Sequence, residues 1–587
     1  MEIVIFDFEV FKYDVLLGAL VLSKDGNQLY QLWDKNEIKK FYGLHYDDLW
    51  IGHNNCDYDN FILQAIIDGK DVKKENDRLI HSKYPGFLHI HLNYYDLMRE
   101  HFGSLKVMEA YMGKNISETE VDFDLDRPLT AEEKELTNRY NQDDLNQTLC
   151  DFNYLKNSEI ELKLNLLNEF GFGINNLNRS TASLAAVILN AKRIDGIENW
   201  KKPIQLYPNL RIDNEEIKRY YLNREYINNN KIIYFGNTPH TLAKGGIHGA
   251  LEKVYFPYAY YFDVSGYYNL VMINYDLLPR SIPPKGKERY IQMYKDQIKM
   301  KKTDPQKRKV YKPILLSVFG AQDNENSDFY DPQQGELVRI TGQLFIIDLL
   351  EKLSKISIII QSNTDGIMVF PNKGIKEDQI KDILDEWMKR TKFVLHTSVI
   401  YDLYQRDVNN YCYREKDGKI VTKGEALKYY HQIDNPYSTE AYRAKEPLII
   451  SYAITDFLIN KIPPEETIDK YKNNLFMYQF ICKKNSFDWL EIQEDDLVNN
   501  LSKVTKLQKV NRCFPRADNR IVGTIYKRKY SGKTTKARYQ NTPDNVFIFN
   551  EDIRSDENKK LLFSKIDWNY YVERSYERIL EFMGDKK

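Results

Sequence analysis

The stretch IIIQSNTDGIMVF, residues 358–370, places a single acid, Asp365, at a polar break between two apolar runs. Short runs rich in Ile and Val on both sides of a Ser-Asn-Thr-Asp-Gly break predict a buried β-hairpin with Asp365 at its turn. A lone Asp in a turn is more often a turn residue than a ligand, so a functional interpretation requires a second acid. An aromatic strand from Tyr260 supplies it, because that strand ends at Asp263. Two acids at one end of a sheet could together hold two metal ions.

A basic segment lies between these two acids in the sequence. Residues 295–312 contain eight Lys or Arg and two acids, and a short apolar helix ending in Ser317, Phe319 and Gly320 follows. Metal ions would bind one side of a triphosphate and lysines the other, so the order acid, basic helix, acid indicates a triphosphate site. A solvated basic helix beside an ordinary sheet is the alternative, and it does not explain that order.

A second set of carboxylates begins near the N-terminus. IVIFDFEVF, residues 3–11, alternates like a strand and puts Asp7 and Glu9 on one face, and VLLGALVL follows as the next strand of a meander. Asp59 lies in the first turn of an apolar helix, where the helix dipole favours a carboxylate. Residues 130–155 open with a capping box and predict one long helix that carries a further acid. Two like charges at the end of a buried strand are costly unless a cation lies between them.

Composition bounds the class of protein. A chain of 587 residues is too long for one hydrophobic core and suggests roughly three to five domains. No apolar run approaches the roughly 20 residues of a membrane span, so we expect no membrane partner. The N-terminus lacks a basic leader and a small-residue cleavage site, and we interpret it as part of the fold. Five cysteines without C-x-x-C spacing argue against a disulfide framework or a zinc site and fit a reducing cytoplasm.

The charge is balanced overall but unevenly distributed. The net charge is -1, while residues 503–538 contain twelve Lys or Arg and one acid. That window therefore carries +11, and the remainder carries 72 - 84 = -12. A basic stripe on an acidic body is typical of a nucleic-acid interface, and a solvated charged surface is an equally open interpretation.

These patterns resemble two known sets of motifs. The N-terminal residues follow the order D-x-E, N-x3-Y-D and Y-x3-D, which resembles the DEDD-type 3′-5′ proofreading exonucleases in their Tyr-containing branch. DVSGYYN, KPILLSVFG and SNTDG look like motifs A, B and C of family B DNA polymerases. The whole chain thus resembles a family B DNA polymerase of bacteriophage type with an N-terminal proofreading exonuclease.

The resemblance implies roles for the matched residues. The metal ligands and catalytic acids would be Asp263 and Asp365 in the polymerase site and Asp7, Glu9, Asp59 and Asp144 in the exonuclease site, where Tyr140 would orient the attacking water. Nucleotide-binding residues would be Lys312 on the triphosphate, Tyr268 as the gate that excludes a ribose 2′-OH, and Lys299 as a weaker second phosphate contact. DNA contacts would come from Asn54, Tyr411, Gly245, Gly246, Lys527, Arg528 and Lys529.

The resemblance also implies a multidomain α/β fold, in which an RNase H-like exonuclease precedes a right-hand polymerase with palm, short helical fingers and a mostly helical thumb. The expected boundaries are the exonuclease at 1–160, a connecting and early palm region at 161–262, palm with motif A at 263–294, fingers with motif B at 295–320, palm with motif C and a primer-grip region at 321–445, and a basic DNA-binding thumb at 446–587. The short gaps between the motifs leave room for two-helix fingers and predict an ordinary primer-template enzyme.

The implied activity is DNA-directed synthesis of phage DNA by two-metal-ion nucleotidyl transfer, with 3′-5′ proofreading. Each active site would use two Mg²⁺ ions, with Mn²⁺ able to substitute, and the partners would be primer-template DNA and dNTPs. We expect a monomer in the cytoplasm, and a clamp, helicase or SSB partner is not identified by the sequence.

Two alternatives stay open. Leu316 replaces the usual Asn of motif B and Asn363 the first Asp of motif C, which leaves room for a 3′-5′ exonuclease with an inactive polymerase domain. A non-catalytic DNA-binding replication factor that uses the basic stripe is the other, and it requires both carboxylate sets to be accidental.

Overall fold

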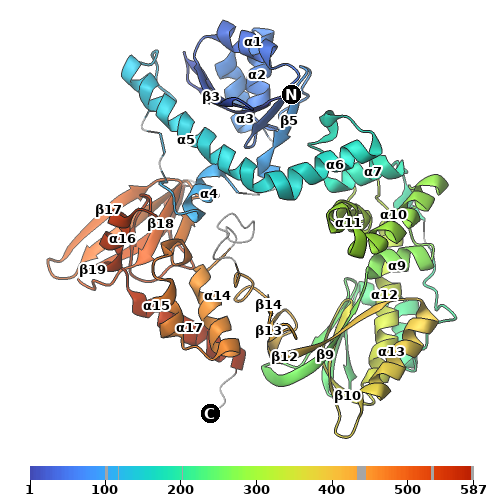
Figure 1. Cartoon of the computed structure of the whole chain (residues 1–587). Coiled ribbons are helices and arrows are strands. Elements are labelled where there is room, and N and C mark those ends of the chain that lie inside the picture. The colour runs from blue at the N-terminus through green and yellow to red at the C-terminus, as the bar shows by residue number, and fades with distance from the viewer. Residues whose placement is uncertain are drawn as a thin grey trace. The chain divides into compact units, whose positions relative to one another are not determined.

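The computed structural model describes the chain except residues 83, 100–102, 117, 120, 201, 432–443, 531–533 and 584–587, and the side chains of residues 158, 302 and 306 (Figure 1). Its internal contacts divide it into two compact units. The first comprises Met1–Asn178, Tyr429–Ala453 and Pro464–Arg574, and the second comprises Arg179–Lys428, Ile454–Pro463 and Ser575–Lys587. The predicted ranges 1–160 and 446–587 therefore fall largely in one unit, and residues 432–443 of the predicted palm lie outside the described residues.

The first unit contains a five-stranded sheet in the order β3-β2-β1-β4-β5. Its strands are β1 (Ile3–Val10), β2 (Val15–Ser23), β3 (Gly26–Leu32), β4 (Leu49–Gly52) and β5 (Asn93–Asp96). The first three strands form the predicted antiparallel meander, and β4 and β5 run parallel to β1. The N-terminal helices of the unit are α1 (Lys35–Leu44), α2 (Asp59–Asp68), α3 (Val72–His81), α4 (Leu105–Tyr111), α5 (Ala131–Leu155) and α6 (Glu161–Phe170).

Local signals set the start of two of these helices as predicted. Helix α2 begins at Asp59, and α5 begins after Thr130 with both bonds of a capping box formed between Thr130 and Glu133. The buried core of the sheet is aromatic and β-branched, with Phe6 packed edge-on against the fully buried Trp50 at a centroid distance of 5.1 Å. This packing fixes β1, and with it the acids that β1 carries.

The expectation that residues 446–587 are mostly helical is wrong. Between its helices the described part of this region forms seven strands: β15 (Phe480–Lys483), β16 (Trp489–Asp496), β17 (Leu501–Leu507), β18 (Val510–Pro515), β19 (Ile521–Tyr530), β20 (Thr534–Arg538) and β21 (Val546–Ile548). They form one sheet of order β15-β18-β21 and another of order β17-β16-β19-β20. The segment IVGTIYKRKY, which forms β19, is rich in β-branched and aromatic residues, which favour strands, and the helical signal of α14 (Leu448–Thr455) does not extend to it. The other helices are α15 (Pro464–Tyr471), α16 (Asp556–Phe563) and α17 (Trp568–Met583).

The second unit is built on a nine-stranded sheet of order β14-β13-β12-β9-β11-β10-β8-β7-β6, whose neighbouring strands are all antiparallel. The strands are β6 (Lys231–Phe235), β7 (Thr238–Leu242), β8 (Ile247–Ala250), β9 (Val254–Val264), β10 (Ser357–Asn363), β11 (Gly366–Pro371), β12 (Leu395–Asp407), β13 (Asn410–Arg414) and β14 (Ile420–Lys423). Helices α9 (Tyr267–Asn274), α12 (Pro332–Leu353) and α13 (Glu377–Thr391) lie on one side of the sheet (Figure 1).

The basic segment between the acids forms two helices, as predicted. They are α10 (Pro284–Thr303) and α11 (Pro305–Gly320), and α7 (Thr181–Leu189) packs against both, while α8 (Glu215–Leu222) lies in the same unit. Asp304 ends α10 and caps α11, because its carboxylate accepts the backbone N–H of Lys307 at 3.0 Å.

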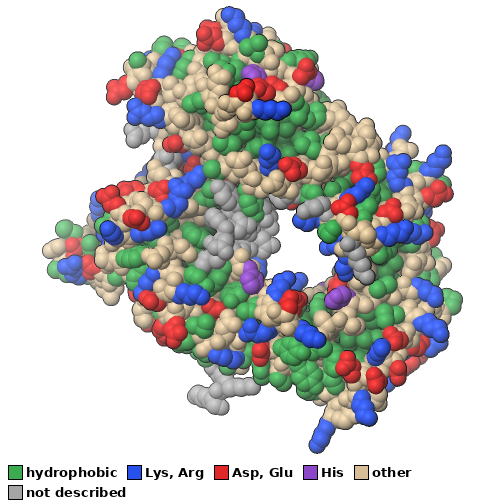
Figure 2. Space-filling model, in the orientation of Figure 1, with side chains coloured by type: hydrophobic (Ala, Val, Ile, Leu, Met, Phe, Trp, Pro, Cys, Tyr) green, Lys and Arg blue, Asp and Glu red, His purple; other side chains and the backbone are tan. Residues whose placement is uncertain are grey.

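On the face of the molecule that Figure 2 shows, Lys and Arg side chains are interspersed with Asp and Glu side chains. None of the described helices is long and apolar enough to cross a membrane.

Candidate active sites

Asp263 and Asp365 meet at one end of the nine-stranded sheet. Strand β11 lies between β9 and β10, and Gly366 pairs directly with Asp263. Asn363 and Gly366 close a two-residue turn in which Thr364 has φ of +60° and Asp365 follows, which confirms the predicted hairpin. The backbone N–H of Val264 donates to the carbonyl of Asp365 at 3.0 Å and fastens the turn to β9.

The environment of this pair favours the uncharged acids in the absence of a cation. Burial raises the pKa of Asp263, and burial followed by the charge of Asp263 raises the pKa of Asp365 to about 6. The positive charge of Lys312 acts in the opposite sense on Asp263. Two neighbouring half-buried carboxylates offer the oxygen ligands that hard divalent cations such as Mg²⁺ prefer.

Two histidines flank the pair in the same crosswise row of the sheet. The row runs through residues paired across five strands: His248, Asn363, Gly366, Asp263 and His396. His248 Nδ1 hydrogen-bonds Asn363 Oδ1 at 2.9 Å. Sequence reasoning missed both histidines, because their positions depend on strand register and no local pattern reports it.

The residues predicted to bind the nucleotide lie on the neighbouring helices. Tyr268, in the first turn of α9, stacks on Phe319 of α11 with ring centroids 4.1 Å apart. Burial raises the pKa of Tyr268 to about 12, and the charge of Asp365 adds to the rise. Lys312 is exposed on α11, Lys299 is exposed on α10, and Leu316 of α11 is 48% exposed. The structure thus brings Tyr268 and Lys312 within electrostatic range of the acids, while Lys299 is placed only on the same helical pair.

The residues predicted to contact the DNA strands lie on both sides of the two acids in the sheet. Tyr411 is buried on β13, where it belongs to a hydrophobic cluster with Met368 of β11 and Ile400 of β12. Gly246 precedes β8, and a Cβ there would lie 2.8 Å from His248 Nε2, so only glycine leaves the imidazole its place. Gly245 is exposed beside it, and an added Cβ would meet nothing within 4 Å.

The acids of the first unit converge in the same way. Ligand oxygens of Asp7, Glu9 and Asp144 all lie within 4.8 Å of one another. Asn141, which is fully buried on α5, donates from Nδ2 to Asp7 Oδ2 at 2.9 Å. Asp59 is adjacent, since its Oδ1 accepts the backbone N–H of Phe8 between the two acids of β1 at 3.1 Å.

Crowding and burial disfavour the charged forms of these acids. Burial, reinforced by neighbouring acids, raises the pKa of Asp7 well above its usual value and that of Glu9 to about 8. Burial also raises the pKa of Asp59 to about 7. Such a set of oxygen ligands fits two divalent cations, whose charge would hold all four acids ionised at neutral pH.

Lys106 is a member of this site that sequence reasoning missed. It lies in the first turn of α4, donates from Nζ to Asp144 Oδ1 at 2.6 Å, and sits over the ring of Tyr140 at 4.6 Å from the centroid. Burial and the charge of Asp144 raise the pKa of Tyr140. Asn141 was missed as well, although its place one residue beyond Tyr140 on the same helix was a usable signal.

Asn54 occupies the loop that leads into α2. It adopts a φ of +69°, and its backbone N–H donates to Asp96 Oδ1 at 2.9 Å. Asp96 Oδ2 accepts the N–H of Cys56 at 3.2 Å, so one buried carboxylate at the end of β5 fixes the loop that leads to Asp59.

The three basic residues predicted to contact DNA do not all lie on one face of β19. Lys527, Arg528 and Lys529 are consecutive on β19, and successive side chains of a strand point to opposite faces. Arg528 donates to Glu491 Oε1 at 2.6 Å, whereas Lys527 lies over the rings of Phe487 and Tyr539 at 4.8 and 5.1 Å. Arg528 is therefore separated from Lys527 and Lys529.

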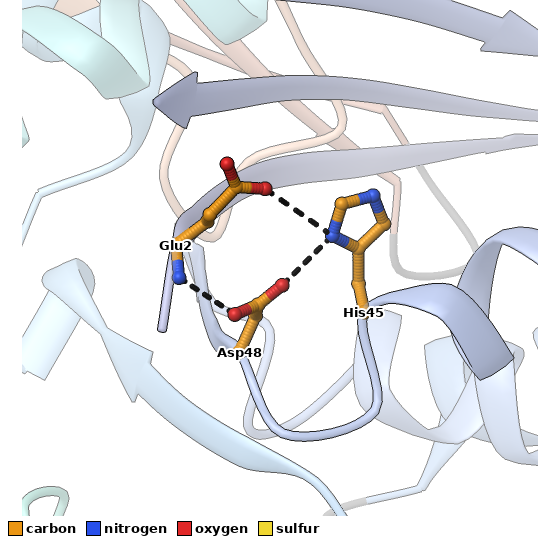
Figure 3. A group of neighbouring side chains, drawn as sticks. All are labelled: Glu2, His45 and Asp48. Carbon is orange, nitrogen blue, oxygen red and sulfur yellow. Dashed lines mark hydrogen bonds and ion pairs between the residues drawn. The ribbon is translucent and has the colours of Figure 1, made fainter. Parts of the chain in front are cut away.

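A third group of potential ligands, Glu2, His45 and Asp48, lies at the other end of β1 (Figure 3). Asp48 accepts the backbone N–H of Glu2 at 2.6 Å, and its other oxygen lies 2.8 Å from His45 Nδ1. These bonds hold the start of β1 against the turn before β4, where Ile3 pairs with Leu49. The hydrogen bonds of this group therefore explain it as a structural contact that stabilises the sheet.

Comparisons with known proteins leave the family open. No protein-family model matches the chain, and no curated protein matches it. Among solved structures, the family B DNA polymerase of the hyperthermophilic archaeon Pyrobaculum calidifontis is similar at 13% sequence identity and a TM-score of 0.43, covering 100% of this chain and 78% of that one. A likeness of that degree does not identify the family of this chain.

Proposed function

We propose that the protein is a DNA-directed DNA polymerase of family B with a 3′-5′ proofreading exonuclease in the same chain. The observation that carries the proposal is the presence of two separate carboxylate groups, Asp263 with Asp365 and Asp7 with Glu9, Asp59 and Asp144, each gathered from distant sequence positions. The sheet order β3-β2-β1-β4-β5 around the second group supports an RNase H-like exonuclease fold.

In the polymerase site, Asp263 and Asp365 would hold two Mg²⁺ ions. Bound there, the ions would activate the primer 3′-OH and stabilise the charge on the transferring phosphate. Lys312 would bind the triphosphate from α11. Tyr268, held by its stack on Phe319, would close the space needed by a ribose 2′-OH.

In the exonuclease site, Asp7, Glu9, Asp59 and Asp144 would hold the second pair of ions. Tyr140 lies one turn from Asp144 on α5 and would orient the attacking water. Lys106 would keep Asp144 ionised and in place through its 2.6 Å contact. Asn54 would lie along the single strand that enters this site.

DNA contacts outside the two sites would come from Tyr411, Gly245 and Gly246 near the polymerase acids and from the basic strands β19 and β20. Because β19 alternates, Lys527 and Lys529 would serve one face and Arg528 the other. We propose phage DNA replication as the setting, with the protein acting as a monomer in the host cytoplasm.

The test follows a 5′-labelled primer annealed to a longer template with Mg²⁺, with and without dNTPs. We expect Asp365→Ala to abolish extension and keep primer shortening, and Asp7→Ala to abolish shortening and keep extension. Asp276→Ala, an exposed acid paired with Lys287 at 3.3 Å, is the matched control for the first change. Asp126→Ala, an exposed acid paired with Lys12, is the control for the second.

The outcomes separate the alternatives. A wild-type protein that shortens the primer and never extends it is an exonuclease with an inactive polymerase domain, and exposed Leu316 becomes the first position to revert to Asn. A protein that binds DNA and does neither is a non-catalytic replication factor, and the proposal fails.

A further inference from the structure

Helix α4 stands between the exonuclease-type acids and the C-terminal strands of the same unit. Its first turn carries Lys106, which reaches Asp144. Its apolar side packs against β15 and β18, where Val107, Met108 and Tyr111 form a core with Val510. The helix is only seven residues long, so its position is set by these neighbours more than by its own hydrogen bonds.

Arg512 of β18 is the residue that grips the far end of this helix. It is fully buried, and all four of its side-chain hydrogen bonds go to neutral oxygens. Nη2 donates to the carbonyls of Ala110 and Lys114, both at 2.9 Å. Nη1 donates to the carbonyl of Glu551 at 2.7 Å, and Nε donates to Gln479 Oε1 at 2.6 Å.

This arrangement is specific to a guanidinium. The last carbonyls of a helix lack partners within it and carry the negative end of the helix dipole, so a buried cation there is favoured. A planar group with donors on three nitrogens can bond all four oxygens at once, whereas an ammonium group cannot. Removing Arg512 would take away the donor of the Lys114 and Glu551 carbonyls and of the buried Gln479 Oε1, which is costly unless the neighbouring groups move.

Backbone bonds extend the same contact. Gln479 Nε2 donates to the carbonyl of Tyr111 at 3.1 Å, and the N–H of Ile116 donates to the carbonyl of Asn550 at 2.7 Å. The N–H of Ile553 donates to the carbonyl of Gly113 at 2.9 Å. Strand β18 and the loops that adjoin β15 and β21 therefore contact the segment that follows α4 at several points, of which Arg512 makes the most hydrogen bonds.

We propose that Arg512 is a positioning residue for the exonuclease site, which acts through α4 by setting where Lys106 meets Asp144. The role rests on the proposed exonuclease function. It makes the C-terminal strands part of the nuclease, although none of their residues belongs to the acid cluster. A shift of α4 along its axis would withdraw Lys106 from Asp144 and leave the acids of β1 where they are.

The test compares full-length variants in shortening a 5′-labelled single-stranded oligonucleotide with Mg²⁺. Arg512→Met is expected to lower kcat at least tenfold and to change KM for the oligonucleotide less than twofold, while primer extension stays at the wild-type rate. Arg512→Lys is expected to lie between wild type and Arg512→Met. Arg516→Met is the matched control, because Arg516 lies just beyond β18 and pairs with Glu494 instead of α4.

A double-mutant cycle distinguishes positioning from a general loss of stability. If Arg512 acts through Lys106, then Arg512→Met combined with Lys106→Met is no slower than Lys106→Met alone. Two outcomes would overturn the role. In one, the losses in kcat of the two single variants multiply in the double variant; in the other, Arg512→Met shortens the oligonucleotide as fast as the control Arg516→Met. If Arg512→Met does not fold, Arg512→Lys replaces it in the same double-mutant cycle. The role then requires that Arg512→Lys lower kcat at least threefold.

The failure of this role is distinct from failure of the proposed function. A wild-type protein that does not shorten the oligonucleotide removes both. A wild-type protein that shortens it and an Arg512→Met protein that shortens it equally well remove only the role of Arg512.

Discussion

Glu9→Gln should stabilise the metal-free protein at alkaline pH. Glu9 is 6% exposed on β1, and its pKa is raised from 4.5 to about 8, chiefly by burial and then by the charge of Asp144. A rise of about 3.5 corresponds to about 5 kcal/mol, at about 1.36 kcal/mol for each pKa unit. This is the order of the free energy that ionising Glu9 in the folded state would cost without a cation.

The sign follows from where the proton is held. Between about pH 4.5 and 8 the folded protein keeps a proton on Glu9 that the unfolded chain has released, so stability falls as the pH rises through this interval. Glutamine is neutral throughout and does not incur this loss. We therefore expect Glu9→Gln to gain up to about 5 kcal/mol over wild type above pH 8, on the order of 10 °C in the Tm of the first unit, and to gain little below pH 5.

Differential scanning calorimetry in EDTA from pH 5 to 8.5 measures this directly. Glu132→Gln, an exposed acid in the first turn of α5, is the control and should leave the profile unchanged. Adding Mg²⁺ at pH 8 should raise the Tm of wild type more than that of Glu9→Gln. A Glu9→Gln protein that is less stable than wild type at pH 8.5 in EDTA would refute the reasoning.

Three further changes test other parts of the structure. Thr130→Ala removes one half of the capping box of α5 and should lower the free energy of unfolding by about 1 kcal/mol in urea titrations, while Thr130→Ser should not. Asp331→Ala removes a fully buried carboxylate and leaves the largely buried Arg280 without the partner that it contacts at 2.6 Å, which should cost about 3–5 kcal/mol by the same titrations, with Asp331→Asn recovering part. Gly246→Ala puts a Cβ 2.8 Å from His248 Nε2 and should raise the KM for primer-template severalfold in extension assays. Adding His248→Ala removes the clash and should restore the KM. A double variant with a KM as high as that of Gly246→Ala would contradict this account.

Much of the local structure could be predicted from the sequence, because it depends on neighbours along the chain. The turn at Asp365, the meander that carries Asp7 and Glu9, and the helix that places Tyr140 and Asp144 one turn apart all follow from periodicity and capping. The C-terminal strands were missed, because the helical character of the strongly apolar segment Leu448–Thr455 was extended over a region whose strands are rich in β-branched and aromatic residues.

Only the tertiary structure decided which distant residues meet. Strand register set His248, Asn363, Asp263 and His396 in one row, and a one-residue slip would have turned each to the opposite face. Helix packing brought Lys106 to Asp144 and Arg512 to the end of α4, contacts that span 38 and about 400 residues of sequence. Dihedral preferences and side-chain periodicity act within a few residues and can be read locally, whereas register and packing depend on how whole elements bury their surfaces against one another.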